Sequence, residues 1–416
     1  MELKRVVVTG IGALTPIGNN VDDYWTGLIN GVSGADFITL FDASKFKTRF
    51  ACEVKNFDPI QFMDRKEARK IDRFTQFALV ASDQAMTDAG LNKENINPDR
   101  IGVVFGSGIG GIITFQTEVA EFARGDGTPR FNPFFIPKMI LDIAAGQISM
   151  RHNLRGPNFA VVSACATSTN AIIEAFNLLR LGKADIILSG GSEAVIIEAG
   201  VGGFNAMKAM SERNDDPKTA SRPYDKDRDG FVMGEAAGVL VLETLEHALA
   251  RGAKIYCEIA GGGATADAHH ITAPHPDGLG AKNVMIAALE DAEMKPEDID
   301  YINTHGTSTP LGDGAEAKAI VDVFGEHAYN LNISSTKSMT GHCLGAAGVI
   351  EAIACIKSLV HDLIPPTINH FTDDPVLDPK LNFTFNKSQK RKVRAALSNT
   401  FGFGGHNAAV IVKKYQ

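Results

Sequence analysis

Three side chains in this sequence have the types and settings that suit covalent catalysis. Cys165 lies in VVSACATSTN, where an apolar stretch meets a helical pattern, and His305 and His342 lie in the glycine-bounded loops YINTHGTSTP and SSTKSMTGHCLGAAG. We expect the Cys165 thiol to have a lowered pKa, because the free N–H groups and the positive dipole end of a helix N-terminus favour the thiolate. A thiolate is a nucleophile, and the same N–H groups can bind an oxyanion. The two neutral imidazoles can donate hydrogen bonds to a developing negative charge.

A lysine in the same loop as His342 joins this set. Lys337 precedes His342 by five residues and could pair with either Glu316 or Glu351. A solvated surface lysine is the alternative, and the position of Lys337 in the loop of a candidate catalytic histidine disfavours it.

The remaining cysteines and histidines are interpreted as structural. Five cysteines without CxxC spacing argue against a disulfide framework and a zinc site, and they favour a reducing, cytoplasmic compartment. A histidine cluster in a Pro/Gly loop lacks a cysteine or acidic partner at ligand spacing, so no metal site is predicted. The residues concerned are Cys52, Cys257 and Cys355, and His269, His270 and His275.

Alternating strands and helices must position these side chains. Five apolar runs bounded by glycine predict buried strands, and two amphipathic stretches that end in glycine predict helices. The predicted strands are residues 5–11, 101–107, 158–164, 185–191 and 237–243, and the predicted helices are 71–90 and 167–182. This alternation indicates α/β layers around buried sheets.

Two short matches suggest that the chain contains one unit twice. The pattern Asp88-Ala89-x-x-x-x-Glu94-x-Ile96 recurs from Asp291 at an offset of 203, and Ile173-Glu174-Ala175 recurs from Ile350 at an offset of 177. The difference predicts an insertion in the first copy, which we assign to a Pro/Phe-rich loop of about residues 108–140. The chain is therefore divided into halves 1–252 and 253–416.

The second match also relates two candidate catalytic residues. Cys165 and His342 each stand nine residues before the matching glutamate. If a pseudo-twofold axis relates the halves, it would bring this cysteine and this histidine face to face.

Charge and hydropathy narrow the range of partners. The 416 residues carry a formal net charge of −8, which argues against nucleic acid as the main partner. We expect no membrane insertion, because no apolar run approaches the ~18–20 residues that a span needs. Four cations fall on one stripe of a predicted helix, which is either an ordinary solvated face or a docking surface for an acidic partner. They are Lys66, Arg69, Lys70 and Arg73.

Five motifs together resemble the β-ketoacyl-[acyl-carrier-protein] synthases, the condensing enzymes of fatty-acid synthesis. They are SACATSTN, SRPYDKDRDGFVMGE, NTHGTSTPLGD, SSTKSMTGHCLGAAG and NTFGFGGHN, and they extend in order over essentially the whole chain. GSGIGG (106–111) resembles the type II enzymes; it also fits a dinucleotide-binding pattern, but weakly. The resemblance implies a thiolase-like α/β fold whose duplicated halves form a five-layered α-β-α-β-α core.

The resemblance also implies catalytic roles. Cys165 would accept an acyl chain, and His305 and His342 would stabilise the enolate formed when malonyl-carrier protein loses carbon dioxide. Lys337 and Glu351 resemble a supporting ion pair, and Glu316 is assigned a supporting role as well. The backbone N–H groups of Cys165 and Phe401 would form the oxyanion hole, with Phe401 as gatekeeper of the acyl pocket. Substrate-binding positions are Ile109, Phe204, Thr307, Thr309 and Gly402.

The implied partners are acyl carrier protein and a second copy of the chain, in a cytoplasmic homodimer. Substrates would arrive on the phosphopantetheine of the carrier, so no cofactor is expected. Carrier docking is assigned to Lys66, Arg69, Lys70, Arg73 and Lys208. Three alternatives remain: a polyketide-type ketosynthase, a type I synthase, and a non-catalytic chain-length partner subunit.

Two positions depart from the family pattern. Cys343 follows His342 where many relatives have an apolar residue, and His406 stands where relatives often have threonine. Both are interpreted as structural.

Overall fold

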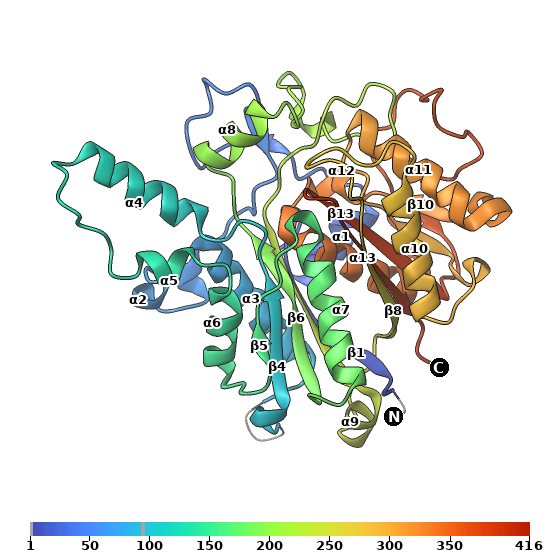
Figure 1. Ribbon diagram of the computed structural model, residues 1–416, viewed down its shortest axis with the longest axis horizontal. Coiled ribbons are helices and arrows are strands. Elements are labelled where there is room, and N and C mark those ends of the chain that lie inside the picture. Colours follow the sequence, from blue (N-terminus) through green and yellow to red (C-terminus); the bar gives the residue numbers. More distant parts are fainter. Residues whose placement is uncertain (1–2, 93–95) are drawn as a thin grey trace.

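The structure is a computed structural model that describes residues 3–92 and 96–416. Its centre is a ten-stranded mixed sheet in the order β10-β9-β13-β14-β8-β1-β7-β6-β4-β5 (Figure 1). The strands are β1 Val6–Leu14, β4 Ile101–Gly106, β5 Asn158–Phe159, β6 Ile186–Glu193, β7 Ala236–Thr244, β8 Cys257–Ala266, β9 Tyr301–Asn303, β10 Asn332–Ser334, β13 Ala395–Gly402 and β14 His406–Lys413. Two small pairs lie outside it: β2 Asp36–Phe37 with β3 Phe50–Ala51, and β11 Leu363–Ile364 with β12 Gln389–Lys390.

The sheet consists of two halves with the same strand arrangement. Outward from the centre, one half runs β1-β7-β6-β4-β5 and the other β8-β14-β13-β9-β10. In each half the first two neighbouring pairs are antiparallel and the next two are parallel. The halves join where β1 pairs with β8 between Val6 and Ile259. The predicted duplication is therefore present. The division after residue 252 stays a prediction, and it falls in the segment that links α9 to β8.

Helices cover the outer faces of the two sheet halves and also fill the space between the halves. They are α1 Val21–Ile29, α2 Arg65–Ala68, α3 Arg73–Asp88, α4 Ile112–Arg124, α5 Phe135–Met139, α6 Ile143–His152, α7 Thr167–Arg180, α8 Glu198–Ala206, α9 Leu245–Ala250, α10 Leu279–Asp291, α11 Pro310–Phe324, α12 Lys337–Thr340 and α13 Ala347–His361. Helix α3 packs on one half and α10 on the other, whereas α7 and α13 contact strands of both. The halves therefore lie on opposite sides of α7 and α13, which gives the five layers.

The most apolar helix is α13, one of the two helices between the sheet halves. Within the described residues, one helical segment, Leu344–His361, is long and apolar enough to cross a membrane by length and composition, although the sequence analysis found no such run. Of this segment, 89% is buried inside the fold. Its apolar character follows from its place between the sheet halves, because a helix covered on all sides carries no polar face.

Two sequence predictions in the first half are wrong. The insertion of about residues 108–140 is not simply a loop, since it contains α4 and α5 and forms an arm that stands away from the body (Figure 1). The run 158–164 forms only the two-residue strand β5, and both residues are exposed. In this run Phe159 and Val162 are 40% and 54% exposed, so its apolar character does not correspond to a buried strand.

Candidate active site

Cys165 lies on a sharp turn between the first-half sheet and helix α7. A 3-10 turn, Ala164–Ala166, leads into α7, and Ala164 has a φ of +51°, which a residue other than glycine rarely adopts. The turn is held against the end of β13. A Cβ atom on Gly402 would lie 2.6 Å from the Ser163 carbonyl oxygen, so only glycine permits this approach.

The pKa of Cys165 differs from the sequence prediction. Burial raises the pKa of the Cys165 thiol to about 12, although the charge of Lys337 and the backbone N–H of Phe403 act in the opposite direction. The expectation of an acidified thiol is therefore wrong. Its physical reason is that Cys165 is only 7% exposed and that α7 begins two residues later, at Thr167. Cys165 is therefore a thiol at neutral pH, and it would have to lose its proton to act as a nucleophile.

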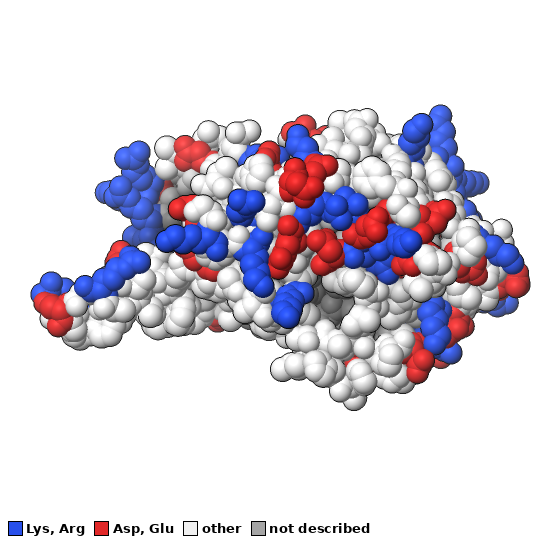
Figure 2. All heavy atoms as spheres, turned by 90° about the horizontal axis from the view of Figure 1, so that it is seen from above, with Lys and Arg blue, Asp and Glu red and all other residues white. Residues whose placement is uncertain are grey.

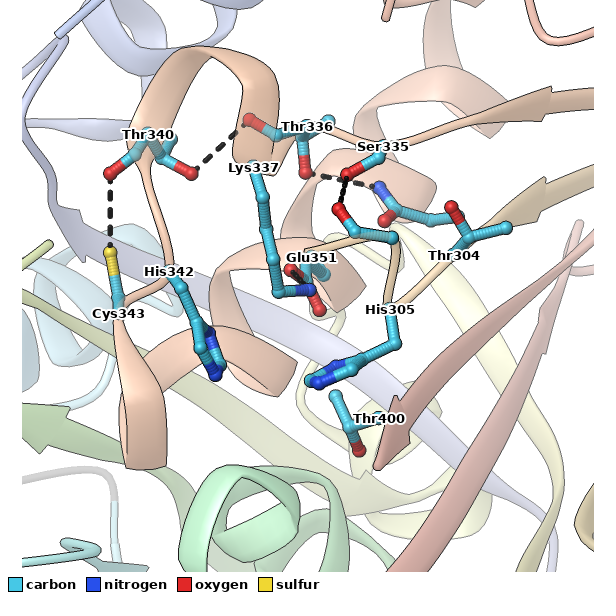
Figure 3. A network of polar contacts seen from close by, with 12 residues as sticks. Thr304, His305, Ser335, Thr336, Lys337, Thr340, His342, Cys343, Glu351 and Thr400 are labelled. Atoms are coloured by element: carbon cyan, nitrogen blue, oxygen red, sulfur yellow. Dashed lines mark hydrogen bonds and ion pairs between the residues drawn. The ribbon is translucent and has the colours of Figure 1, made fainter. Parts of the chain in front are cut away.

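His342 contacts this thiol. Its Nε2 atom lies 3.0 Å from Cys165 Sγ. The ring of His305 stands perpendicular to that of His342, with ring centroids 5.2 Å apart. Figure 3 shows both rings pointing into one space below Lys337. The structure thus brings together the three residues that the sequence analysis selected.

Both histidines are neutral at physiological pH. Burial lowers the pKa of each well below its ordinary value, and the positive charge of Lys337 acts in the same direction. A neutral imidazole can donate one hydrogen bond and accept another. Each ring can therefore donate a proton to an oxyanion or accept one from a thiol.

Two buried glutamates support the histidine loops. Lys337 forms an ion pair with Glu351, and both are 1% exposed (Figure 3). Glu316 instead accepts hydrogen bonds from the backbone N–H groups of His305 and Gly306, at 2.9 and 2.8 Å. The open choice of partner for Lys337 is settled in favour of Glu351. Burial raises the pKa of each glutamate to about 7.

A cavity of about 430 Å³ opens onto Cys165 and both histidines. Four of the five residues predicted to bind substrate line it, namely Phe204, Thr307, Thr309 and Gly402. The predicted gatekeeper Phe401 and the predicted docking residue Lys208 line it as well. The hydroxyl oxygens of Thr307 and Thr309 lie 3.1 Å apart. Ile109 packs in the apolar cluster around Cys165 and is partly buried there.

The residue whose backbone contacts the thiol differs from the predicted one. The N–H that acts as a donor to the Cys165 thiol is that of Phe403, whereas the ring of Phe401 packs against His305 at a centroid distance of 5.5 Å. The Phe403 ring faces that of Phe204 at 6.3 Å. Sequence reasoning missed Phe403, although the doubled pattern FGFGG offers two aromatic positions. We therefore assign the second N–H of the candidate oxyanion hole to Phe403.

The predicted basic stripe does not form one helix face. Helix α2 ends at Ala68 with Arg69 as its C-cap, and α3 begins at Arg73. Arg73 is 19% exposed and forms an ion pair with Glu235, which is fully buried, so its assignment to docking is wrong. Lys66, Arg69 and Lys70 remain exposed, and the ammonium of Lys70 lies over the ring of Phe134 in the arm. Figure 2 shows mixed charges on one face, with basic groups at the end where Figure 1 places α2, α4 and α5.

The internal match that paired Cys165 with His342 is out of register. Helices α7 and α13 begin 180 residues apart, and the turns before them contain Ala164 and Leu344, both with positive φ and also 180 residues apart. The offset of 177 is thus three residues short, and the equivalent of Cys165 is Gly345. In the other match, the helix ends Asp88 and Asp291 correspond, whereas Glu94 lies outside the described residues.

Of the two residues that depart from the family pattern, one is buried and the other is exposed. Cys343 is fully buried, and its thiol donates to the carbonyl oxygen of Thr340 at 3.6 Å. His406 is exposed at the start of β14. All five cysteines are free and buried.

A buried thiol beside two neutral imidazoles, in a mainly apolar cavity on a duplicated α/β framework, is the arrangement expected of an acyltransferase. The comparisons specify the class. Models of the beta-ketoacyl synthase N-terminal and C-terminal domains match residues 3–248 and 256–371, and the chain belongs to the β-ketoacyl synthase family.

Relatives in sequence and in structure agree with this. The chain is 52% identical to 3-oxoacyl-[acyl-carrier-protein] synthase 2 of Synechocystis sp., over all of this chain and 99% of that protein. It is 51% identical to the synthase of the same name from Staphylococcus aureus strain N315, over 99% of each. A beta-ketoacyl synthase of Burkholderia phymatum has a TM-score of 0.92 at 34% identity, covering 99% and 100% of the two chains. A complex of a type II polyketide acyl-carrier protein with its ketosynthase matches with a TM-score of 0.90, 32% identity and full coverage of both chains.

Proposed function

We propose that this enzyme extends fatty acids by two carbons, joining an acyl chain on Cys165 to the two-carbon unit of malonyl-carrier protein. The observation that carries the proposal is the Cys165–His342 contact at 3.0 Å inside the cavity, with His305 beside it. The proposal is supported by sequence identities of 52% and 51%, over essentially the full length, to enzymes named 3-oxoacyl-[acyl-carrier-protein] synthase 2.

The first half-reaction loads the enzyme. Sγ of Cys165 attacks the carbonyl carbon of an acyl-carrier thioester, and His342 Nε2 accepts the thiol proton as the new carbon–sulfur bond forms. The N–H groups of Cys165 and Phe403 stabilise the oxyanion. The carbon–sulfur bond to the carrier then breaks, and its thiolate leaves with the proton from His342.

The second half-reaction forms the carbon–carbon bond. Malonyl-carrier protein loses carbon dioxide, and the electron pair of the broken bond enters an enolate, whose oxygen accepts hydrogen bonds from His305 and from the Nε2–H tautomer of His342. The enolate carbon attacks the Cys165 thioester. The carbon–sulfur bond breaks, and the thiolate of Cys165 takes a proton from the medium. Decarboxylation supplies the carbanion, so hydrogen-bond donors suffice and no strong base is required.

A single experiment tests the nucleophile. The protein is incubated with acyl-carrier proteins of graded chain length, and the mass of each cysteine peptide is measured. We expect an acyl adduct on the Cys165 peptide, and we expect Cys165→Ala to lose both the adduct and condensation. Cys343→Ala is the matched control, because this neighbouring thiol is buried in packing and should be dispensable. Full condensation by Cys165→Ala would refute the proposal.

We also propose that the working form is a cytoplasmic homodimer that takes its substrates from acyl carrier protein and needs no cofactor. Strand β5 is the last in the sheet order, so within the described residues one of its edges has no neighbouring strand, and its Phe159 is exposed. The arm adds six apolar side chains that are each 39–54% exposed: Phe115, Val119, Phe122, Phe131, Phe134 and Ile136. Apolar surface of this kind marks an interface. Free cysteines suit a reducing compartment.

The polyketide-type alternative has weaker support. The ketosynthase of a type II polyketide system among the structural neighbours is 32% identical to this chain, whereas the relatives named 3-oxoacyl-[acyl-carrier-protein] synthase 2 are 51–52% identical. The presence of Cys165 with His342 disfavours a non-catalytic partner subunit.

A further inference from the structure

Glu193, the last residue of β6, is a buried carboxylate beside Cys165 that the proposed reaction does not use. It is fully buried, and burial raises its pKa. A carboxylate removed from water must be held by hydrogen-bond donors. The identity of those donors points to its role.

Four neutral donors converge on this carboxylate. One oxygen accepts from the Ser107 hydroxyl at 2.7 Å and from the Ile109 N–H at 3.2 Å. The other accepts from the N–H groups of Gly108 and Gly345, at 2.8 and 3.0 Å. Backbone N–H groups that converge in this way form an anion-binding nest. Three of the donors come from the GSGIGG turn of the first half, and the fourth comes from the turn before α13 in the second half.

The carboxylate holds these two turns at very short range. A Cβ atom on Gly345 would lie 2.4 Å from the Gly108 nitrogen and 2.7 Å from the Glu193 carboxylate, so the contact requires glycine. The second-half turn is also strained, because Leu344 has a φ of +47°. A bound carboxylate can hold such a conformation in place.

Each of the two turns contributes one apolar side chain to the surroundings of the Cys165 thiol. Ile109 and Leu344 belong to the same apolar cluster as Cys165, and Leu344 also lines the cavity. The Glu193 carboxylate accepts hydrogen bonds from the N–H of Ile109 and from the N–H of Gly345, the residue after Leu344. One side chain therefore sets the spacing of two apolar groups on which an acyl chain bound to Cys165 would pack.

We propose that Glu193 is a positioning residue that determines which acyl chain lengths Cys165 accepts, by fixing Ile109 and Leu344 across the junction of the two halves. The inference rests on the proposed function, since it concerns an acyl chain on Cys165. It assigns the specificity to a residue that does not contact the substrate.

The test replaces Glu193 with glutamine and measures kcat/KM for butanoyl- and tetradecanoyl-carrier protein. The amide keeps the shape of the carboxylate, but its NH₂ end is a donor and faces donors, so at least one turn loses a hydrogen bond. We expect the ratio of the two kcat/KM values to change about tenfold, the factor that corresponds to one hydrogen bond of ordinary strength. The matched control is Glu243→Gln. Glu243 is also fully buried, but it is held by Thr9, His247 and Arg251, and this variant should change stability without changing the ratio.

A second readout tests whether Glu193 carries its charge beside Cys165. The charge of Glu193 contributes to raising the pKa of Cys165, so the neutral glutamine should make Cys165 react faster with iodoacetamide at a fixed pH of about 8. The reaction is followed by the mass of the Cys165 peptide. Glu243→Gln should leave this rate unchanged.

An unchanged chain-length ratio in an active Glu193→Gln enzyme would overturn the inference. If that variant does not accumulate as folded protein, Ser107→Ala decides, because it removes one of the four bonds. A smaller change in the ratio in Ser107→Ala supports the inference, and an unchanged ratio overturns it. Full activity of Cys165→Ala would instead refute the proposed function, so the two failures are distinguishable.

Discussion

The two histidines of the site have different neighbours and should fail in different ways when they are replaced. His342 contacts the thiol, whereas His305 contacts the rings of His342 and Phe401. We expect His342→Ala to slow both Cys165 acylation and malonyl decarboxylation by about 100-fold or more, because it removes a proton acceptor and an enolate donor. His305→Ala should slow decarboxylation and spare acylation. Single-turnover acylation and release of labelled carbon dioxide measure the two steps, and equal losses in His305→Ala would contradict this division.

Glu316 gives the molecule a defined pH dependence of stability. Its pKa is about 7 in the folded protein and near 4.5 when the chain is unfolded. Between these values the folded state holds a proton that the unfolded state has released, so the free energy of unfolding should fall as pH rises from about 4.5 to about 7, by up to about 3 kcal/mol. Glu316→Gln removes this contribution. Urea unfolding at about pH 5 and about pH 7.5 should show a smaller difference for the variant than for the wild type. An equal difference would refute the assignment, and Glu351 continues to titrate in both proteins.

At the scale of elements, the short helix α2 and the residues after it carry the exposed positive charge near the arm. We expect the double charge reversal Lys66→Glu and Arg69→Glu to raise KM for carrier-bound substrates about tenfold with little change in kcat, because opposite charges mainly speed encounter. Added salt should reduce the difference between variant and wild type. Lys390→Glu, an exposed lysine on β12, is the control. An unchanged KM would show that this surface is an ordinary solvated face and does not dock the carrier.

Arg73 illustrates how an element boundary changes the role of a residue. It is the first residue of α3, and its guanidinium forms two hydrogen bonds to the buried carboxylate of Glu235, at 2.6 and 3.0 Å. Removing one partner of such a pair leaves an uncompensated buried charge. We expect Arg73→Ala to lower the free energy of unfolding by about 3 kcal/mol or more, measured by chemical denaturation. Lys70→Ala should stay within about 0.5 kcal/mol of the wild type, as substitutions at the surface usually do.

At the scale of the whole molecule, the arm and the β5 edge should be covered by a second copy. We expect Phe122→Asp to convert the dimer into a monomer at micromolar concentration, because it places a charge in an apolar interface. Sedimentation velocity measures the change. Phe371→Asp is the matched control, since Phe371 is also exposed but lies in the other half. A wild-type protein that sediments as a monomer would refute the dimer.

The sequence predicts the large features of this molecule better than the local ones. Most of the predicted strands follow from hydrophobic periodicity, the set Cys165, His305 and His342 follows from motifs, and the duplication follows from short repeated matches along the chain. The pKa of Cys165 could not be predicted, because it depends on how much of the chain closes over the thiol. The pairing of Arg73 with Glu235 joins residues 162 positions apart, and no spacing along the chain encodes it. The choice between Phe401 and Phe403 likewise depends on the three-dimensional course of one turn.

The pairing of β1 with β8 has a consequence for how the chain folds. Val6 is hydrogen-bonded in register with Ile259, so the two sheet halves cannot join until more than 250 residues have been synthesised. Contacts of such long sequence separation make folding slow, and large chains of this kind pass through partly assembled states. The active site takes Cys165 from one half and both histidines from the other. The active site is therefore assembled late in folding. A first half that is still bound to the ribosome contains Cys165 but lacks both histidines, so it is not yet active.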